Sequence, residues 1–135
     1  MTKILSQLAA AQMLARDWHY SASGAAFYAE HLLADRVAEI AGHADKLKEV
    51  FWLGEKGRVP PTEGVVMTDA IEAYNRANGE SIPQKLADVL RLLAAHAEEL
   101  ARDTSISIGS KSLLDGICAD AYQFVGLIQR TEMEV

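Results

Sequence analysis

The fold of this chain is decided by residues 25–53, AAFYAEHLLADRVAEIAGHADKLKEVFWL, which contain no proline and a single glycine. Apolar residues recur in this stretch at the three- and four-residue spacing of an amphipathic helix. A break that ends at Gly24 precedes it, with Ser23 as the expected N-cap, and Gly54 and Gly57 end it. About 29 residues of α-helix measure roughly 43 Å. We therefore expect a rod that runs the full length of a helix bundle.

Helical spacing also marks the remaining long segments of the chain. A short helix is expected inside a long connection, because its apolar residues fall between segments that contain all three prolines. Two helical hairpins joined by one long crossover give an all-α, ferritin-like four-helix bundle, with residues 1–135 as a single domain. The other expected helices are about 3–20, the short helix 68–77, a helix capped by Ser81 with Pro83 in its first turn, and a last helix after a loop at 103–110.

Composition limits the classes of partner. The chain has 135 residues, and its 13 basic and 19 acidic side chains give a net charge of −6. This balance argues against direct nucleic-acid binding, which depends on Lys and Arg, and suits cations instead. The lone Cys118 forms no disulfide within the chain, and no apolar run reaches the roughly 20 residues of a membrane span. We expect a cytoplasmic protein with no membrane contact.

One face of the long helix carries residues that bind metals. At about 100° per residue, four metal-ligand side chains fall within roughly 40° of one line along the helix. Ala38 and Gly42 lie between them on the same line. One imidazole with several carboxylates suits iron, manganese or zinc better than copper(I). The four candidate ligands are His31, Asp35, Asp45 and Glu49.

The order of residues on this stripe is symmetric about position 40. If two copies of the helix packed antiparallel about a two-fold axis there, Ala38 and Gly42 would permit close approach as dimer contacts. His31 and Asp35 of one chain would then face Asp45 and Glu49 of the other, which makes two identical sites. The alternative interpretation is that the stripe is only the solvated face of the helix.

These residues resemble a known family. The segment Asp17-Trp18-His19, followed by Gly24 and Phe27, then the two pairs of ligand residues and finally Leu53-Gly54, is similar to the Dps branch of the ferritin-like superfamily. The resemblance covers about a third of the chain.

The resemblance implies a ferroxidase centre shared across a two-fold dimer interface. It implies iron as the bound metal, as a mono-iron or di-iron centre, and a homo-oligomer that is at least a dimer and in the family often a dodecameric shell that oxidises iron(II) and stores the mineral. By position, His19, His31 and Asp35 come from one chain, and Asp45 and Glu49 from its partner.

Two departures from the family pattern leave alternatives open. Trp18 precedes His19 here, whereas the family order is histidine before tryptophan, so an alignment on the tryptophan makes Asp17 the ligand. The gap between the two ligand pairs is one residue shorter than in typical members, and an ungapped alignment puts Lys46 and Val50 in place of Asp45 and Glu49. The competing hypothesis is a metal-free bundle that acts as a structural or protein-interaction module.

Overall fold

The computed structural model describes residues 1–132, and these are all-helical with no β-strand, as the sequence predicts. The last three residues of the expected 1–135 domain lie outside the described part of the chain. The elements are α1 (Thr2–Ser21), α2 (Phe27–Ala38), the 3-10 helix η1 (Glu39–Gly42), α3 (His43–Leu47), the π-helix η2 (Lys48–Glu55), α4 (Glu63–Arg76), α5 (Ile82–Ala101) and α6 (Ile108–Thr131).

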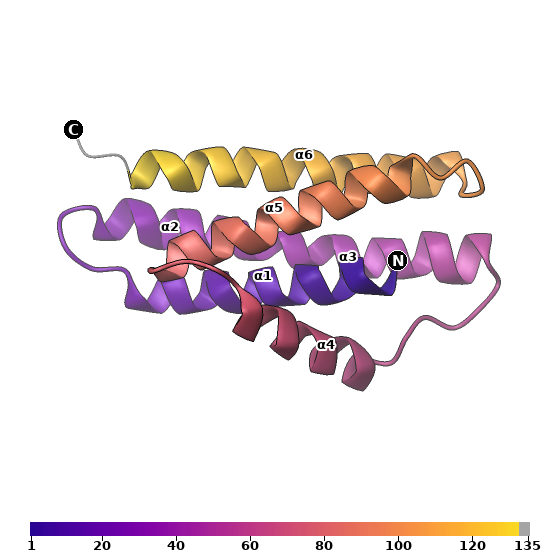
Figure 1. The fold of residues 1–135 in the computed structure, drawn as a ribbon, viewed down its shortest axis with the longest axis horizontal. Helices are drawn as coiled ribbons and strands as arrows, with labels where there is room; N and C mark the ends of the chain where they lie inside the picture. The colour runs from indigo at the N-terminus through magenta and orange to yellow at the C-terminus, as the bar shows by residue number, and fades with distance from the viewer. Residues whose placement is uncertain (133–135) are drawn as a thin grey trace.

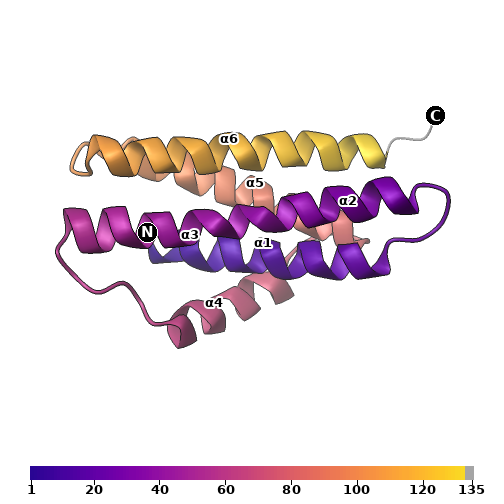
Figure 2. The same cartoon turned by 180° about the vertical axis from the view of Figure 1, so that it is seen from behind.

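Four long helical units pack side by side (Figure 1). They are α1, α5, α6 and a continuous helical stretch from α2 through η2, which we call the rod. α1 lies between the rod and α5, and α6 packs against α5 and against the later part of the rod. Neighbours in each hairpin are antiparallel, whereas the rod and α5 run in the same direction, because the connection through α4 returns along the bundle. Seen from behind, α4 lies along α1 on the outside of the bundle (Figure 2).

The core lies between the rods and consists mainly of leucine, isoleucine and alanine. On α5 the apolar stripe expected from the sequence is buried, and Leu86, Leu90 and Leu93 have no exposed surface. Burial of such side chains contributes about 1.5–3 kcal/mol each relative to exposure. The buried residues of α6 are Ser110, Leu114, Ile117, Ala121, Phe124, Val125 and Ile128.

Capping residues explain where the later helices begin. The Ser81 hydroxyl accepts a hydrogen bond from the Gln84 N–H at 3.2 Å, and Pro83 lies in the first turn, as predicted. α4 begins earlier than the predicted residue 68, because the Thr62 side chain caps it. The loop expected at 103–110 is shorter in the structure, because the Ser107 side chain caps α6 and this helix begins at Ile108.

The prediction that Ser23 caps the second helix is wrong. α2 begins at Phe27, and its N-cap is Ala26, which offers no side-chain acceptor. Gly24 has a φ of +84°, a left-handed conformation that glycine adopts without strain. The chain therefore turns at Gly24, whose carbonyl accepts a hydrogen bond from the Phe27 N–H at 3.1 Å, and helical structure starts only after this turn.

The rod itself is not one regular α-helix, contrary to the expectation for residues 25–53. It is helical from Phe27 to Glu55, but a 3-10 segment interrupts it at Glu39–Gly42 and a π-helix forms its last part. A 3-10 helix is wound more tightly than an α-helix, and π-helical turns often occur at functional sites. The rod ends before Gly57, which adopts a left-handed φ of +62°.

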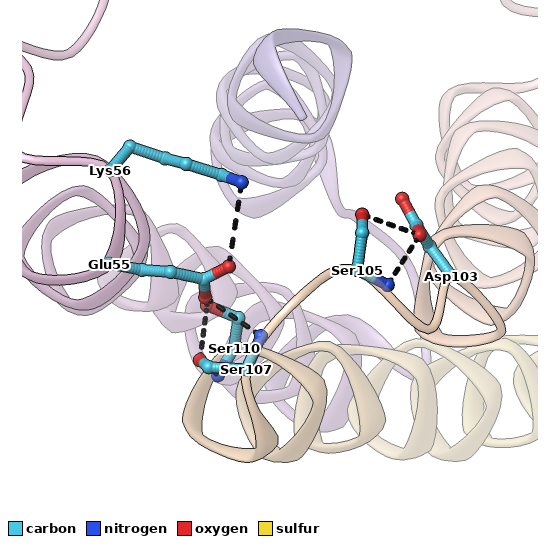
Figure 3. A network of polar contacts seen from close by, with 6 residues as sticks. All are labelled: Glu55, Lys56, Asp103, Ser105, Ser107 and Ser110. Atoms are coloured by element: carbon cyan, nitrogen blue, oxygen red, sulfur yellow. Dashed lines mark hydrogen bonds and ion pairs between the residues drawn. The ribbon is translucent and has the colours of Figure 1, made fainter.

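Glu55 joins the end of the rod to the start of α6 (Figure 3). Its Oε1 accepts hydrogen bonds from the Ser107 N–H at 3.0 Å and from the fully buried Ser110 hydroxyl at 2.6 Å. These hydrogen bonds from Ser107 and Ser110, with Lys56 nearby, lower the pKa of Glu55 from 4.5 to about 2. The Oε1 atom of Glu55 is therefore committed to the fold, and Oε2 lies 3.8 Å from the Lys56 Nζ.

Across residues 1–132, no helix is long and apolar enough to span a membrane.

Candidate metal centre

Two histidines meet where α1 ends and α2 begins. The imidazole rings of His19 and His31 stack with centroids 3.6 Å apart and planes 24° apart. The His19 Nδ1 lies 3.0 Å from the His31 carbonyl oxygen, and the His31 Nδ1 lies 2.8 Å from the His19 carbonyl oxygen. Each imidazole therefore contacts the backbone carbonyl of the other histidine, and this reciprocal pair of contacts fixes the orientation of both rings.

These contacts determine which ring nitrogen carries the proton. A carbonyl oxygen only accepts hydrogen bonds, so each Nδ1 must be the donor. In the neutral form of each ring, Nε2 is then the unprotonated nitrogen with a free electron pair. Metal-binding histidines commonly have this arrangement, in which one ring nitrogen donates to a carbonyl and the other binds the ion. In the neutral rings, these contacts leave the Nε2 atoms of His19 and His31 unprotonated, as in many metal-binding histidines.

Asp35 lies on the same face of the molecule, one turn after His31. With His19, it lines a depression of about 190 Å³ between α1 and the rod. This volume is below the roughly 300–1,000 Å³ of sites for drug-sized ligands. It suits an ion with a few water molecules. The other residues lining the depression are Gln12, Arg16, Tyr20, Ala38 and Glu39.

Asp45 and Glu49 are exposed side chains on α3 and η2. The 3-10 segment lies between them and Asp35, and its flanking residues Ala38 and His43 have ψ angles of −25° and −24°. A 3-10 helix turns about 120° per residue against about 100° for an α-helix, so its four residues add roughly 80° of rotation. This rotation brings Asp45 to about the same angular position as Asp35. The two aspartates remain separated along the rod by about 17 Å.

The small residues between these carboxylates are accessible from outside. Gly42 is exposed, and a Cβ added there would meet no atom within 4 Å. Ala38 is half-buried beside the depression. Among residues 1–132, nothing covers the rod at Gly42, so another helix is able to approach it closely.

The structure orients Asp17 differently from His19. The Asp17 carboxylate accepts a hydrogen bond from the Tyr74 hydroxyl of α4, and this contact raises the pKa of Tyr74. His19, two residues further along α1, faces the rod instead and contacts His31. The two alternative ligands of the sequence analysis therefore face different elements, and only His19 joins the histidine pair.

Within residues 1–132, no group of three or more His, Cys, Asp and Glu side chains is arranged to hold a metal ion. The structure brings His19 to His31 and places Asp35 beside the depression that His19 lines. Asp45 and Glu49 lie further along the rod. One chain thus contains two separate groups of the predicted ligands.

Sequence reasoning missed the contact of Tyr20 with His19 and the partner of His43 on α6. Tyr20 contacts the His19 ring edge-on at a centroid distance of 4.9 Å, although neighbouring residues of a helix usually point in different directions. His43 is half-buried, and its Nε2 lies 2.7 Å from an Asp120 carboxylate oxygen on α6. No local pattern signals a pair of residues 77 positions apart.

A larger cavity, with a volume of about 720 Å³, lies elsewhere, between α1, α4 and α5. Its histidine, His96, contacts the buried Gln7 side chain at 3.3 Å, and burial lowers the pKa of His96. These two polar groups contact each other, and the stacked rings of His19 and His31 do not line this cavity.

The chain matches no protein-family model, and no curated protein is found to be similar to it.

Proposed function

We propose that this chain binds iron(II) and oxidises it at sites formed between two of its copies, as the resemblance to the Dps branch suggests. One copy supplies His19, His31 and Asp35, and the second supplies Asp45 and Glu49. The observation that carries the proposal is the reciprocal contact of the two histidines, since both Nδ1 atoms donate to carbonyl groups at 3.0 and 2.8 Å. Both Nε2 atoms are then available to an ion in the neutral rings.

The shape of the rod supports an intersubunit site. The two ligand groups of one chain are about 17 Å apart along the rod, too far to share an ion. An antiparallel partner related by a two-fold axis near position 40 brings Asp45 and Glu49 of the second chain to His31 and Asp35 of the first. The open surface at Gly42 allows the two rods to approach.

The 3-10 segment supports the ligand assignment despite the shorter spacing. The ten residues from Asp35 to Asp45 include four residues of 3-10 helix. Their total rotation about the helix axis is about that of eleven residues of regular α-helix. This rotation gives Asp45 about the angular position of the Dps pattern, and it supports Asp45 and Glu49 over the ungapped alternative of Lys46 and Val50.

The helix connectivity supports a ferritin-like bundle. The rod and α5 run in the same direction because the chain crosses the length of the bundle through α4. A single long crossover is the feature that separates ferritin-like folds from simple up-and-down bundles.

The proposed chemistry is the transfer of an electron from iron(II) to dioxygen or hydrogen peroxide. Carboxylates and imidazoles are suitable ligands for iron, and the negative charge of three carboxylates favours iron(III) over iron(II). Storage of oxidised iron inside a dodecameric shell belongs to the same proposal. Measurement of the assembly mass, together with the iron retained per chain, tests that part separately.

Co-expression of two inactive variants tests the intersubunit arrangement. His31→Ala and Glu49→Ala each remove a ligand from both sites of a homodimer. In a mixed dimer, one site loses both ligands and the other keeps all of them. Random mixing then restores about a quarter of the wild-type iron(II) sites, measured by anaerobic titration. No recovery, with mixed dimers demonstrated by mass spectrometry, contradicts the shared site.

A metal-free interaction module is the second candidate, because the same rod exposes large apolar side chains. Tyr28, Leu32 and Leu53 are 69%, 50% and 54% exposed. Such residues favour a protein interface whether or not a metal is bound. Under this function, wild-type protein shows no iron(II) binding and no oxidation above a protein-free control.

A further inference from the structure

The cavity between α1, α4 and α5 contains a buried polar group with unused hydrogen-bonding capacity. Gln7 of α1 lines this cavity and is only 5% exposed. Its Oε1 lies 3.3 Å from the His96 Nδ1 of α5, and its amide nitrogen donates no hydrogen bond within residues 1–132. In this part of the chain, no side-chain nitrogen or oxygen is both fully buried and unpartnered. The Gln7 amide nitrogen therefore reaches open space, which is the cavity that Gln7 lines.

The polar groups around Gln7 leave this donor available. An amide oxygen only accepts hydrogen bonds, so the His96 Nδ1 is the donor in their contact. Burial lowers the pKa of His96, and its ring is therefore mainly neutral at pH 7. Ser6, a second buried polar residue of the cavity, donates its hydroxyl to the Lys3 carbonyl oxygen at 2.9 Å. At the buried wall, the Gln7 N–H groups thus remain free for an acceptor on a ligand.

Apolar side chains form much of the remaining wall. Val89, Leu92 and Ala95 of α5 line the cavity together with Ala73 and Ala77 of α4. Leu92 is 55% exposed, so the fold leaves apolar surface at this wall in contact with water. A ligand with an apolar body is stabilised here because it removes that surface from water.

The charged residues of the cavity favour a neutral ligand. Two are basic and three are acidic, and the Arg76 guanidinium pairs with the Glu72 carboxylate at 2.6 Å. Charges of both signs therefore offer no strong field for an anion or a cation. The volume of about 720 Å³ lies within the roughly 300–1,000 Å³ of small-molecule sites. The charged lining residues are Lys3, Asp69, Glu72, Arg76 and Glu99.

We propose that this cavity binds a neutral small molecule that has an apolar body and an amide or ketone oxygen. The oxygen accepts a hydrogen bond from the Gln7 amide, and the apolar body lies between α4 and α5. This site is separate from the proposed metal centre, because the cavity and the depression beside Asp35 share no lining residue. Ligand binding and iron(II) binding can therefore be tested independently.

The test uses Prodan, a neutral naphthyl ketone whose fluorescence reports the polarity around the dye and hydrogen bonding to its carbonyl. Titration of the whole chain should give a saturable change in emission. The side-chain amide signals of Gln7 in proton–nitrogen NMR spectra should shift along the same binding curve. Gln7→Leu should weaken Prodan binding about two- to tenfold, as expected for the loss of one hydrogen bond. The emission of the bound dye should also move to shorter wavelength in this variant.

A second variant locates the bound dye without altering the core. Ala95 is an exposed residue at the cavity wall, and the indole of Ala95→Trp should fill the cavity and weaken Prodan binding by more than about tenfold. Ala119→Trp, at an exposed alanine of α6 outside the cavity, is the matched control and should bind Prodan as the wild type does. Circular dichroism checks that each variant is folded.

Three results overturn the proposed site. Absence of saturable Prodan binding excludes it. Binding that Ala95→Trp leaves unchanged places the dye on another apolar surface of the chain. Equal affinity and equal emission of Gln7→Leu and wild type would show that Gln7 does not bind the carbonyl oxygen, which removes the basis for the ligand class.

Discussion

The two ends of the rod from α2 to η2 carry polar clusters that use their hydrogen-bonding capacity in opposite ways. At the η2 end, Glu55 accepts bonds from Ser107 and Ser110, and its carboxylate is committed to the fold. At the α2 end, His19 and His31 use only Nδ1 in contacts with the chain. The pKa of Glu55 is lowered to about 2 by internal bonds, which marks a structural group. Among residues 1–132, folding thus uses the acceptor capacity of Glu55 and leaves the Nε2 atoms of His19 and His31 without a hydrogen-bond partner.

The largest effect is expected at the α2 end. His31→Ala should weaken iron(II) binding by more than about tenfold, a loss that even outer-shell partners of metal ligands can cause. The His31 ring is only half-buried, so the thermal unfolding temperature should change little. Anaerobic iron(II) titration and circular dichroism measure the two effects. His43→Gln, which alters another histidine of the same rod, should bind iron(II) as the wild type does. Equal binding by His31→Ala and wild type would show that the histidine pair is structural.

The next largest effect is expected at the η2 end of the rod, where Glu55 makes the stability of the fold depend on pH. Because the pKa of Glu55 is lowered from 4.5 to about 2 in the fold, its carboxylate stabilises the native state above about pH 4.5. This contribution is lost as the pH falls from 4.5 to about 2, where the native carboxylate becomes protonated.

Urea unfolding of wild type and Glu55→Gln should therefore give a stability difference that is greatest near pH 7 and shrinks as the pH falls through this range. The iron(II) affinity of Glu55→Gln should remain unchanged at pH 7. Glu80→Gln, at an exposed carboxylate before α5, serves as the control. A stability difference that stays constant down to pH 2.5 would refute the assignment.

A smaller effect on the stability of the fold is expected from substitution of Gly42, midway along the rod. Gly42 has helical dihedral angles and open space around it, so Gly42→Leu should not destabilise the monomer. Leucine favours a helix over glycine by up to about 1 kcal/mol, and the unfolding free energy should stay equal or rise. The same change should dissociate the proposed dimer, because the added side chain separates the two rods. Analytical ultracentrifugation measures the mass, and an unchanged dimer would exclude packing through Gly42.

The smallest effect is expected at the Lys48–Glu63 pair, which links η2 to the start of α4 at 2.6 Å. Glu63 is 78% exposed, and exposed ion pairs contribute at most about 1 kcal/mol. Lys48→Ala should therefore lower the unfolding free energy by less than about 1 kcal/mol, with a smaller difference in high salt. A larger loss would mean that this end of the rod depends on α4 as well as on Glu55.

Local signals in the sequence predicted much of the fold. Ser81 and Pro83 mark a helix start through backbone groups within one turn, and the stripe of Leu86, Leu90 and Leu93 follows from helical periodicity. The family resemblance assigns His19 and His31 to one site, but no sequence pattern predicts that each Nδ1 contacts the backbone carbonyl of the other histidine. Contacts such as Ser110 with Glu55, 55 residues apart, depend on how the rods pack and leave no local pattern.

The 3-10 segment of the rod makes residue number a poor measure of position in this protein. Ten residues that include this segment advance about 17 Å, and eleven residues of α-helix advance about 16.5 Å with nearly the same rotation. Four residues of 3-10 helix thus offset one residue of α-helix in both rise and rotation. A pattern that fixes the number of residues between two side chains on one face misses this equivalence, whereas a pattern written as rotation and rise keeps it. Helical bundles whose long helices contain such segments are therefore best compared by helix geometry.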